Sequence, residues 1–475
     1  MSEPLPQATD GLLASEQRRI AERDQEGVPW DLWGSYLPER QWGTVREDYS
    51  ADGDAWSSFP HDHARSRVYR WGEDGLLGLC DRQCRLCFSM ALWNGVDPIL
   101  KERPFGLANG EGNHGEDVKD YFFHLANTPT HSFLRALYKY PQQRFPYERL
   151  LAESRARGRD QHEFELVDTG IFEESRYFDV VIEVAKAAPD DLAIRLRAIN
   201  RGPDPAPLHL LPTLWLRNTW SWGYPDEHET PMQLEGDVLV AQVGGGLGRY
   251  ALQAREQAPW LFTDNETNHE RLFGRANPRP FQKDGFHRHL IAGEAGAINP
   301  EQRGTKAARW LQRTLAPGEE WEVALRLRGP ASAAAGEPFG ADFDQLFRAR
   351  EQEWQTFFTS RVPGLAEDDR RIHTAAAAGL LWGKKYYGWS VQRWLNGDPT
   401  APPPPAQRWH SANRQWQRLY ANDVISMPDC WEYPYFCQWD LMFHAVAFAI
   451  FDPVTAKHQC TLLRSPHYTA PNAQT

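Results

Sequence analysis

The stretch YFDVVIEVAKAAPDDLAIRLRAIN, residues 177–200, decides the fold, because apolar and polar side chains alternate along it. Alternation with period two is typical of half-buried β-strands. The same period-two alternation recurs between Gln161 and Pro330. It is found over Phe164–Phe172, Tyr177–Ala185, Leu192–Asn200, Leu208–Trp215, Asp237–Val243, Tyr250–Ala254 and Glu320–Arg328. Turn-forming residues separate several runs, at 201–204 (RGPD), 244–246 (GGG) and 317–318 (PG). Many strands at short spacing predict an antiparallel β-sandwich.

The residues before this region are more irregular. Residues 28–160 are rich in aromatic residues, glycine and proline, with short strand-like runs at Arg67–Trp71, Arg85–Trp93 and Tyr121–His124. A short helix is expected over Leu134–Tyr140. Residues 1–27 form a polar lead-in, expected to be helical or disordered. We therefore predict an aromatic-rich sandwich region over residues 28–330.

Helical periodicity replaces the strand pattern near Pro330. Residues 331–365 are expected to form a linker that contains a helix over Phe343–Thr359. A strong helix begins at Glu367, where acidic residues match the dipole at a helix N-terminus. Its expected apolar face consists of Ile372, Ala375, Ala376, Gly379 and Leu380. With further helices over Met442–Ile450 and Val454–Leu463, residues 366–475 are predicted to be all-α.

Composition narrows the classes of partner. The chain has 475 residues and a net charge of −12, which argues against a nucleic-acid backbone as partner. No apolar run approaches the ~20 residues that a membrane span needs. Met1–Glu26 has no apolar signal-peptide core, so a cytoplasmic protein is expected. The 20 tryptophans fit either a large aromatic core or a sugar-binding protein.

Two clusters resemble metal ligands, but neither predicts a metal site. Cys80, Cys84 and Cys87 lack a second ligand pair at matching spacing, so core packing is expected, with zinc as the alternative. The residues His61, Asp62 and His63, with Glu47 and Asp48 upstream, are expected to form a solvated turn. There is no phosphate-binding loop, dinucleotide motif or nucleophile elbow. We expect no metal and no cofactor.

The stretch WEYPYFCQWDLMFH, residues 431–444, places five aromatic side chains in the nine residues before Asp440. Aromatic faces stack on sugar rings, and a carboxylate beside them accepts sugar hydroxyls, so the stretch predicts a carbohydrate subsite. The alternative is that Asp440 caps the following helix. Asp440 could also be a general acid, but glycoside hydrolysis normally uses two carboxylates, and no clear partner is present.

A second polar and aromatic loop, His410–Asp423, lies shortly before this motif. Arg414, Trp416 and Asp423 are its candidate substrate contacts. A structural ion pair between Arg414 and Asp423 is an equally good interpretation.

The stretch WEYPYFCQWDLMFHAVAFAIFDPVTAKHQ, residues 431–459, resembles bacterial relatives of glycoside hydrolase family 63, the processing α-glucosidase I and mannosylglycerate-hydrolase-like group. Residues 367–399 look like the first barrel helix of those proteins. Upstream, RLCFSMALWNGVDPILKERPFGL, GNHGEDVKDYFFHL and LHLLPTLWLRNTWSW are similar to their N-terminal region. The resemblance covers nearly the whole chain from about Trp30.

This resemblance implies a β-sandwich followed by an (α/α)6 six-hairpin barrel. It implies an inverting, exo-acting hydrolase of α-linked glucosides or related small glycosides. Trp439 and Asp440 would bind the sugar at the cleavage subsite, with Tyr435, Phe436 and Gln438 as neighbours. The catalytic acid and base belong to later motifs, expected downstream of Thr475, so no catalytic residue is assigned in this chain.

The number of residues after Glu367 is too small for a complete (α/α)6 barrel. Twelve helices of ~11 residues with loops of ~5 need roughly 190 residues, whereas Glu367 to Thr475 comprises 109. We therefore expect an incomplete barrel with an exposed apolar surface, in a truncated chain that is inactive alone. The alternatives are a non-catalytic carbohydrate-binding or partner-dependent module, and a related (α/α)6 phosphorylase or debranching enzyme. The expected partner is a carbohydrate, and the oligomeric state stays open.

Overall fold

The structure is a computed structural model. It describes residues 15–40, 59–108, 110–115, 117–334, 336–429, 431 and 436–469. Within these ranges, no helix combines the length and apolar character needed to cross a membrane.

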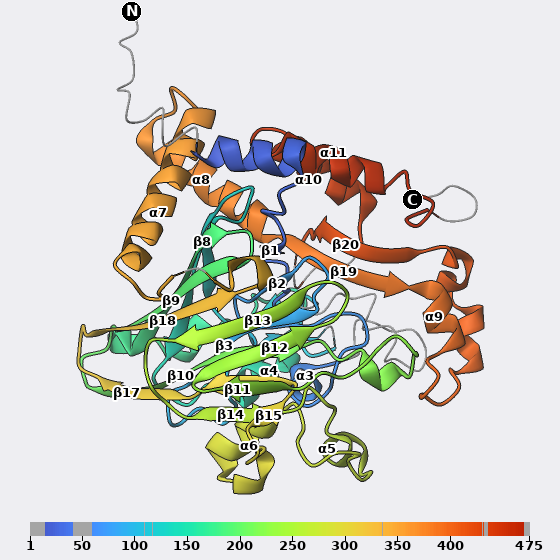
Figure 1. The fold of residues 1–475 in the computed structure, drawn as a ribbon. Coiled ribbons are helices and arrows are strands. Elements are labelled where there is room, and N and C mark those ends of the chain that lie inside the picture. Colours follow the sequence, from blue (N-terminus) through green and yellow to red (C-terminus); the bar gives the residue numbers. More distant parts are fainter. Residues whose placement is uncertain are drawn as a thin grey trace, which may run out of the picture.

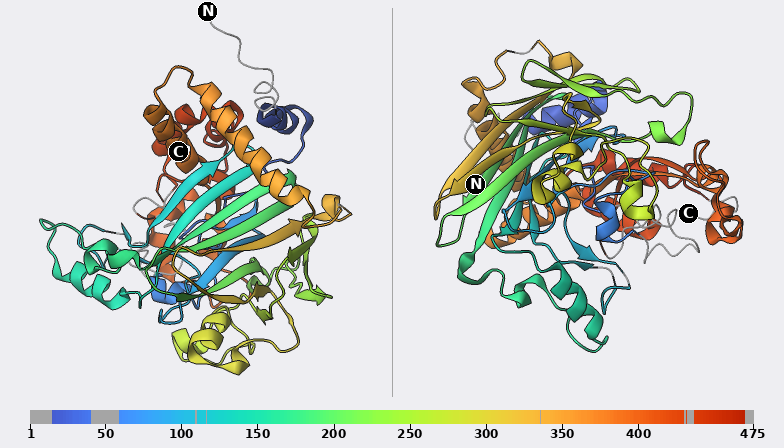
Figure 2. Two further views of the ribbon diagram at one scale, coloured as in Figure 1. Left: turned by 90° about the vertical axis from the view of Figure 1, so that its left-hand side faces the viewer. Right: turned by 90° about the horizontal axis from the view of Figure 1, so that it is seen from below.

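Two antiparallel sheets face each other (Figures 1 and 2). The seven-stranded sheet contains β1 (Trp33–Gly34), β2 (Leu79–Asp81), β3 (Leu86–Trp93), β10 (Ala206–Leu216), β14 (Trp260–Thr263), β16 (Lys306–Arg309) and β17 (Leu311–Leu315). The nine-stranded sheet runs in the order β15 (Arg303–Gly304), β11 (Met232–Glu235), β12 (Val238–Val243), β13 (Gly248–Ala254), β18 (Glu320–Arg328), β9 (Asp191–Asn200), β8 (Tyr177–Ala188), β7 (Phe133–Pro141) and β6 (Phe122–Asn127). A separate pair joins β4 (Gly106–Leu107) to β5 (Asp117–Val118).

One hydrophobic core fills the space between the large sheets. Its side chains alternate along the strands, as Phe88 and Met90 do on β3 and Ile194 and Leu196 do on β9. The period-two pattern is therefore confirmed for most of the predicted strands. Three expectations are wrong. The strand-like run Arg67–Trp71 is irregular and forms no strand. Phe164–Phe172 contains a 3-10 helix at Leu166–Thr169, and the helix expected at Leu134–Tyr140 is strand β7, whose alternate side chains enter this core.

Helices lie outside the two sheets (Figure 1). One set consists of α3 (His61–Ala64), α4 (Tyr147–Ala156), α5 (His269–Phe273), α6 (Gly285–Ala292) and α9 (Val391–Asn396). The other set, in the upper part of Figure 1, consists of α7 (Asp342–Arg361), α8 (Glu367–Trp382), α10 (Gln438–Phe448) and α11 (Pro453–Leu462). Phe343 and Phe347 of α7 pack on the nine-stranded sheet, against Phe133 and Ala185.

The expected apolar face of α8 is wrong. Ile372 is 69% exposed, and the helix instead buries Ala377, Ala378, Leu381 and Trp382. Trp382 joins the sandwich core and donates its Nε1–H to the backbone oxygen of Ala126, 2.8 Å away. The helix therefore seals the end of the sandwich with the face opposite to the predicted one.

The predicted all-α region also contains a two-stranded antiparallel ribbon, β19 (Lys384–Ser390) with β20 (Tyr420–Ser426). One face of the ribbon packs Tyr386 and Val424 toward the seven-stranded sheet. The other packs Tyr387 and Ile425 beneath α10, against Leu441. The described residues after 366 contribute α8, α9, α10, α11 and this ribbon, so the six-hairpin barrel stays a prediction.

Candidate functional site

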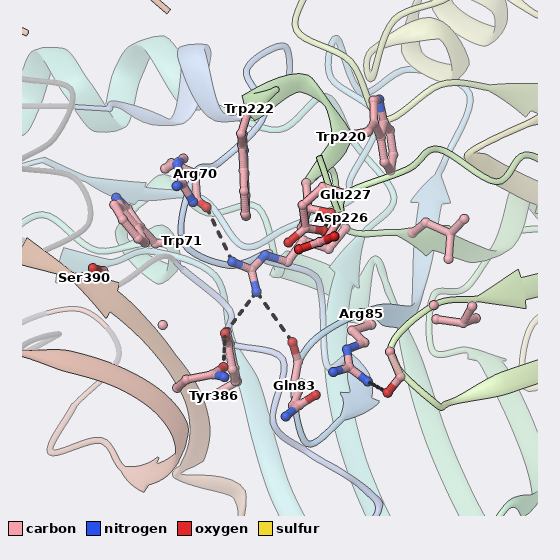
Figure 3. A pocket seen from close by; sticks show the side chains of 18 of the residues that line it. Arg70, Trp71, Gln83, Arg85, Trp220, Trp222, Asp226, Glu227, Tyr386 and Ser390 are labelled. Carbon is pink, nitrogen blue, oxygen red and sulfur yellow. Dashed lines mark hydrogen bonds between the residues drawn. The ribbon is translucent and has the colours of Figure 1, made fainter. Parts of the chain in front are cut away.

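A cavity of about 540 Å³ lies where the ribbon meets the sandwich (Figure 3). It is lined by Arg70 and Trp71 before β2, by Gln83 and Arg85 of the β2–β3 turn, by residues between Leu216 and Thr230 after β10, by the β12–β13 turn, by Arg393 of α9, and by Tyr386, Gly388–Ser390 and Tyr420–Asn422 of the ribbon. Six separate parts of the chain thus build one pocket of a size typical of small-molecule sites.

Tryptophan rings form much of the wall. Trp71 and Trp389 meet edge to face, with ring centroids 5.0 Å apart. Trp222 is buried, whereas Trp220 is half-buried and donates its Nε1–H to Glu266, 2.7 Å away. Nε1 of Trp389 is buried and has no hydrogen-bond partner among the described residues. The cavity wall therefore presents flat apolar faces.

Two arginines stand between these rings. Arg70 makes a bidentate ion pair with Asp398, at 2.6 and 2.7 Å, and its guanidinium lies 3.6 Å from the ring centroid of Trp222. Arg217 donates to the hydroxyl of Tyr386 at 3.0 Å (Figure 3). Burial alone would lower the pKa of Arg217, but the Tyr386 hydroxyl and the Cys84 thiol beside it raise the pKa above its usual value. Arg217 therefore stays a cation.

Oxygen acceptors complete the lining. Glu227 accepts a hydrogen bond from the hydroxyl of Thr219 at 2.6 Å, and Asp226 is exposed at the same loop. The Tyr386 hydroxyl donates to Asn422 at 2.8 Å. Tryptophan faces with carboxylate and amide oxygens beside them suit a ring-shaped ligand that carries several hydroxyl groups.

The aromatic motif on α10 lies elsewhere. Trp439 is 68% exposed and contacts Phe443 edge to face at 5.9 Å. Asp440 is half-buried and is the third residue of α10, whose N-cap is Cys437, so the alternative of Asp440 as N-cap is wrong. Gln438, the first helical residue, is half-buried too.

The remaining residues of that motif point away from solvent or are not described. Phe436 packs inward, stacked on Tyr387 at 5.9 Å. Tyr435 lies outside the described residues, as do Glu432 and Tyr433. The structure thus separates the exposed Trp439 from Phe436, which sequence reasoning had grouped as one subsite.

The second predicted loop is also divided. Asp423 pairs with Arg82 at 2.8 Å and lies 3.0 Å from His458, while the exposed Arg414 donates to the backbone oxygen of Trp409. The predicted ion pair between Arg414 and Asp423 is therefore wrong. Trp416 packs, half-buried, against the core beneath α10.

Among the predicted residues that the structure describes, Asp423 alone comes near the main cavity. It borders a neighbouring cavity of about 420 Å³, which shares Gln83, Arg85, Gly245 and Asn422 with the first. Sequence reasoning missed Arg217, Trp220 and Trp222. Their signal was the stretch LRNTWSW, residues 216–222, which places an arginine and two tryptophans directly after a strand.

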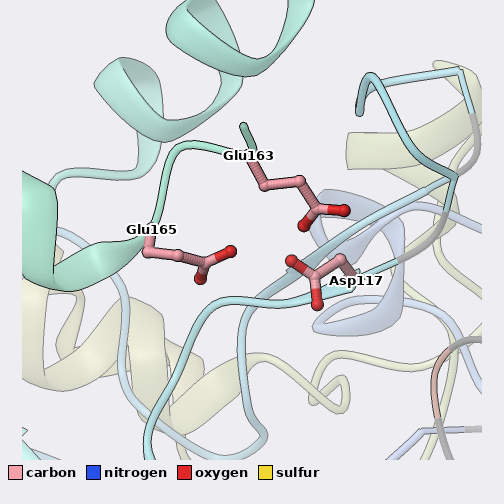
Figure 4. A group of neighbouring side chains, drawn as sticks. All are labelled: Asp117, Glu163 and Glu165. Carbon is pink, nitrogen blue, oxygen red and sulfur yellow. The ribbon is translucent and has the colours of Figure 1, made fainter. Parts of the chain in front are cut away.

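A carboxylate group at the base of the β4–β5 pair has the spacing of metal ligands (Figure 4). Its members, Asp117, Glu163 and Glu165, surround the buried ammonium group of Lys119, which contacts all three. Burial, with a hydrogen bond from Glu163, raises the pKa of Asp117 to about 6. The lysine already provides the positive charge that a cation would bring.

The cysteines pack as expected. Cys80, Cys84 and Cys87 are buried in one cluster with Tyr36 and Trp215, and the sulfurs of Cys84 and Cys87 lie 3.6 Å apart. The solvated turn expected at residues 61–63 is confirmed for the exposed Asp62 but is wrong for His61. Glu47 and Asp48, which were expected beside it, lie outside the described residues. His61 begins helix α3 and stacks on Tyr147, and burial lowers the pKa of its imidazole.

No family model matches the chain. The chain is 39% identical, over 504 aligned positions, to the uncharacterized protein YMR196W of Saccharomyces cerevisiae (strain ATCC 204508 / S288c); the alignment covers 97% of this chain and 46% of that protein. The chain thus spans about half the length of the curated relative it matches.

Two solved structures overlap the chain at low TM-scores. One is a 4-alpha-glucanotransferase from Thermococcus litoralis, with a TM-score of 0.24, 12% identity, and coverage of 63% of this chain and 34% of that one. The other is a putative kojibiose phosphorylase from human microbiome, with a TM-score of 0.28, 9% identity, and coverage of 75% and 44%.

Proposed function

We propose that the chain is the sandwich-bearing part of a carbohydrate-active enzyme and that the tryptophan-lined cavity binds a saccharide. The observation that carries the proposal is the wall of Trp71, Trp220, Trp222 and Trp389 around about 540 Å³, with hydroxyl-binding oxygens beside the rings. Indole faces supply apolar contact area at low conformational cost, and few polar groups then orient the ligand.

The finer proposal is an inverting, exo-acting, α-glucosidase-like glycoside hydrolase. It rests on the resemblance of residues 431–459 and of the N-terminal motifs to glycoside hydrolase family 63. Inversion needs a carboxylic acid and a carboxylate set apart to admit water. We assign neither to residues 1–475, and we keep Trp439 and Asp440 as contacts of the cleavage subsite.

The surface of α10 supports an incomplete barrel. Its exposed apolar residues follow helical spacing and form one stripe of Trp439, Met442, Phe443, Val446 and Ile450. Such a stripe on a helix is normally covered by another element. Helices that bring the acid and base would pack here and place both groups over Asp440.

Ligand binding tests the coarser proposal. Maltose and methyl α-D-glucopyranoside are added to the chain, and binding is measured by saturation-transfer NMR and calorimetry. Trp220→Ala removes a half-buried wall of the cavity and should weaken binding about tenfold, a loss of ~1.4 kcal/mol. The matched control is Trp409→Ala, which removes an exposed tryptophan outside the cavity. Equal binding by both variants would overturn the assignment of the cavity.

A second assay tests where the chemistry lies. The chain is incubated with 4-nitrophenyl α-glucoside, and release of nitrophenolate is followed. We expect no turnover. Turnover that disappears in Asp440→Asn would contradict the absence of a catalytic acid and base from residues 1–475 and would make Asp440 catalytic.

A further inference from the structure

The cavity carries positive charge that the protein leaves unpaired. Among the described residues, no carboxylate oxygen lies within 4.0 Å of the guanidinium nitrogens of Arg85, Arg217 or Arg393. Arg70, in contrast, is paired with Asp398. Three such arginines line one cavity of a chain whose net charge is −12, so they point to a negatively charged ligand.

Of the three arginines, Arg217 provides the strongest evidence for an anionic ligand. Its guanidinium donates only to neutral oxygens, the hydroxyl of Tyr386 and the backbone carbonyls of Gln83 and Arg70. Its Nε–H is shielded from solvent and has no partner. The acidic groups that raise the pKa of this guanidinium, such as Glu73 and the Cys84 thiol, act on it without an ion-pair contact. An anion placed directly against the half-buried guanidinium would therefore add a charge-assisted contact that the fold does not provide.

The other two arginines also line the cavity. Arg85 donates to the backbone oxygen of Gly245 in the β12–β13 turn (Figure 3). The guanidinium of Arg393 lies 4.5 Å from the ring centroid of Tyr224. Both are half-buried, so their remaining N–H groups can reach a ligand without any rearrangement of the fold.

The number and kind of these groups favour a phosphoryl group. A phosphate monoester carries about −1.5 to −2 charges and three strong acceptor oxygens, and the arginine fork matches its geometry. Asp226 and Glu227 would repel an anion placed beside them, but they can accept hydrogen bonds from hydroxyl groups, so they suit the sugar ring and not the phosphoryl group. Resting on the saccharide binding proposed above, we propose that the cavity binds a phosphorylated saccharide, with its phosphoryl group on Arg85, Arg217 and Arg393 and its ring against the tryptophans.

Calorimetry with four probes tests this proposal, in a buffer free of phosphate and at low salt. The probes are glucose, glucose 6-phosphate, glucose 1-phosphate and inorganic phosphate. Arg85→Met and Arg393→Met remove half-buried charges while keeping most of the side-chain volume, so they fold even where Arg217→Met does not. Arg159→Met, at an exposed loop away from the cavity, is the matched control.

We expect at least one glucose phosphate to bind about tenfold or more tightly than glucose, since each charge-assisted hydrogen bond contributes that much. Arg85→Met and Arg393→Met should each lower this ratio, Arg159→Met should not, and added salt should lower it in the unmodified chain.

The failures of the two proposals are distinguishable. If glucose binds and neither phosphate binds more tightly, the phosphoryl inference is wrong and saccharide binding stands. If inorganic phosphate binds as tightly as the glucose phosphates and glucose does not bind, the cavity is a simple anion site and both proposals fail. Binding that is tighter for the phosphates but equal in all arginine variants also overturns the inference.

Discussion

Replacing Asp452 with asparagine tests one buried ion pair that ties both ends of the described chain together. Asp452 precedes α11 and is fully buried, and its two carboxylate oxygens accept hydrogen bonds from Arg23 at 2.8 and 3.2 Å. Arg23 belongs to a helical segment of residues 15–26, far away in sequence. Asp452 also caps α11 by accepting from the backbone N–H of Thr455.

Removing one partner of a buried pair typically costs about 3–5 kcal/mol. Asparagine keeps the side-chain shape and one acceptor for the Thr455 N–H, and Arg23 keeps its contacts with Asp24 and the backbone oxygen of Pro129. We therefore expect Asp452→Asn to lower the free energy of unfolding by about 2–3 kcal/mol at pH 7. Urea unfolding followed by circular dichroism measures it.

The effect should depend on pH. Burial acts to raise the pKa of Asp452, but Lys384 and Arg23 outweigh it and lower the pKa below its ordinary value. A carboxyl group whose pKa is lowered by folding stabilises the fold at pH values above its pKa in the unfolded chain, about 3.9. This stabilisation is lost as the pH falls below that value. The difference between the two proteins should therefore be constant near neutrality and shrink below about pH 4.

Asp369→Asn is the matched control, because Asp369 is exposed in the first turn of α8 and should change the free energy of unfolding by less than about 0.5 kcal/mol. A loss for Asp452→Asn no larger than for this control would refute the ion-pair reasoning. A difference that widens as the pH falls would refute the sign of the pKa argument.

Three further substitutions probe other features. Val446→Lys, on the exposed stripe of α10, should change the free energy of unfolding by less than about 0.5 kcal/mol and reduce self-association in light scattering; a clear destabilisation would mean that the stripe is covered. Lys119→Met should destabilise the fold by about 2 kcal/mol in thermal unfolding, because three carboxylates then repel, with partial rescue by millimolar Ca²⁺; no rescue would count against mutual repulsion. Gly388→Ala would place a Cβ 2.7 Å from both the Trp71 carbonyl oxygen and the Tyr386 hydroxyl; it should cost about 1–3 kcal/mol and weaken maltose binding, and unchanged binding would separate the ribbon from the site.

The strands of the sandwich could be predicted because most of them show the alternation of apolar and polar residues within their own sequence. In β8 and β9, alternate side chains of the quoted stretch enter one core, so the period-two pattern identifies the core-facing residues, even though several of the others are buried too. The burial of α8 was not predictable in the same way. The alanines of its run Ala375–Ala378 place small side chains on every face of the helix, so the sequence does not show which face is buried. The burial of Trp382 in the sandwich core decides which face turns inward.

The ribbon was missed for a related reason. In KKYYGWS, residues 384–390, every side chain is buried, so no polar alternation marks a strand. One face packs on the sandwich and the other beneath α10. A strand covered on both faces shows no period-two alternation. The resemblance of this segment to barrel helices favoured a helix instead.

The cavity could not be predicted, since its parts are hundreds of residues apart. Arg70 and Asn422 line the same space, and only pairing of the ribbon with the sandwich brings them together. The motif at 431–444, in contrast, is contiguous and therefore visible in the sequence, yet its most conspicuous side chain, Trp439, faces solvent. A contiguous motif can be recognised in the sequence, but the sequence does not show which of its side chains will be buried and which will be exposed.

The ribbon gives a physical reason to treat the cavity and α10 as parts of one functional unit. Tyr386 lines the cavity, and its neighbour Tyr387 stacks on Phe436 just before α10. Adjacent residues of a strand point to opposite faces, so β19 contributes one face to the cavity and the other to the packing beneath α10. The ribbon is therefore the element that contacts both regions.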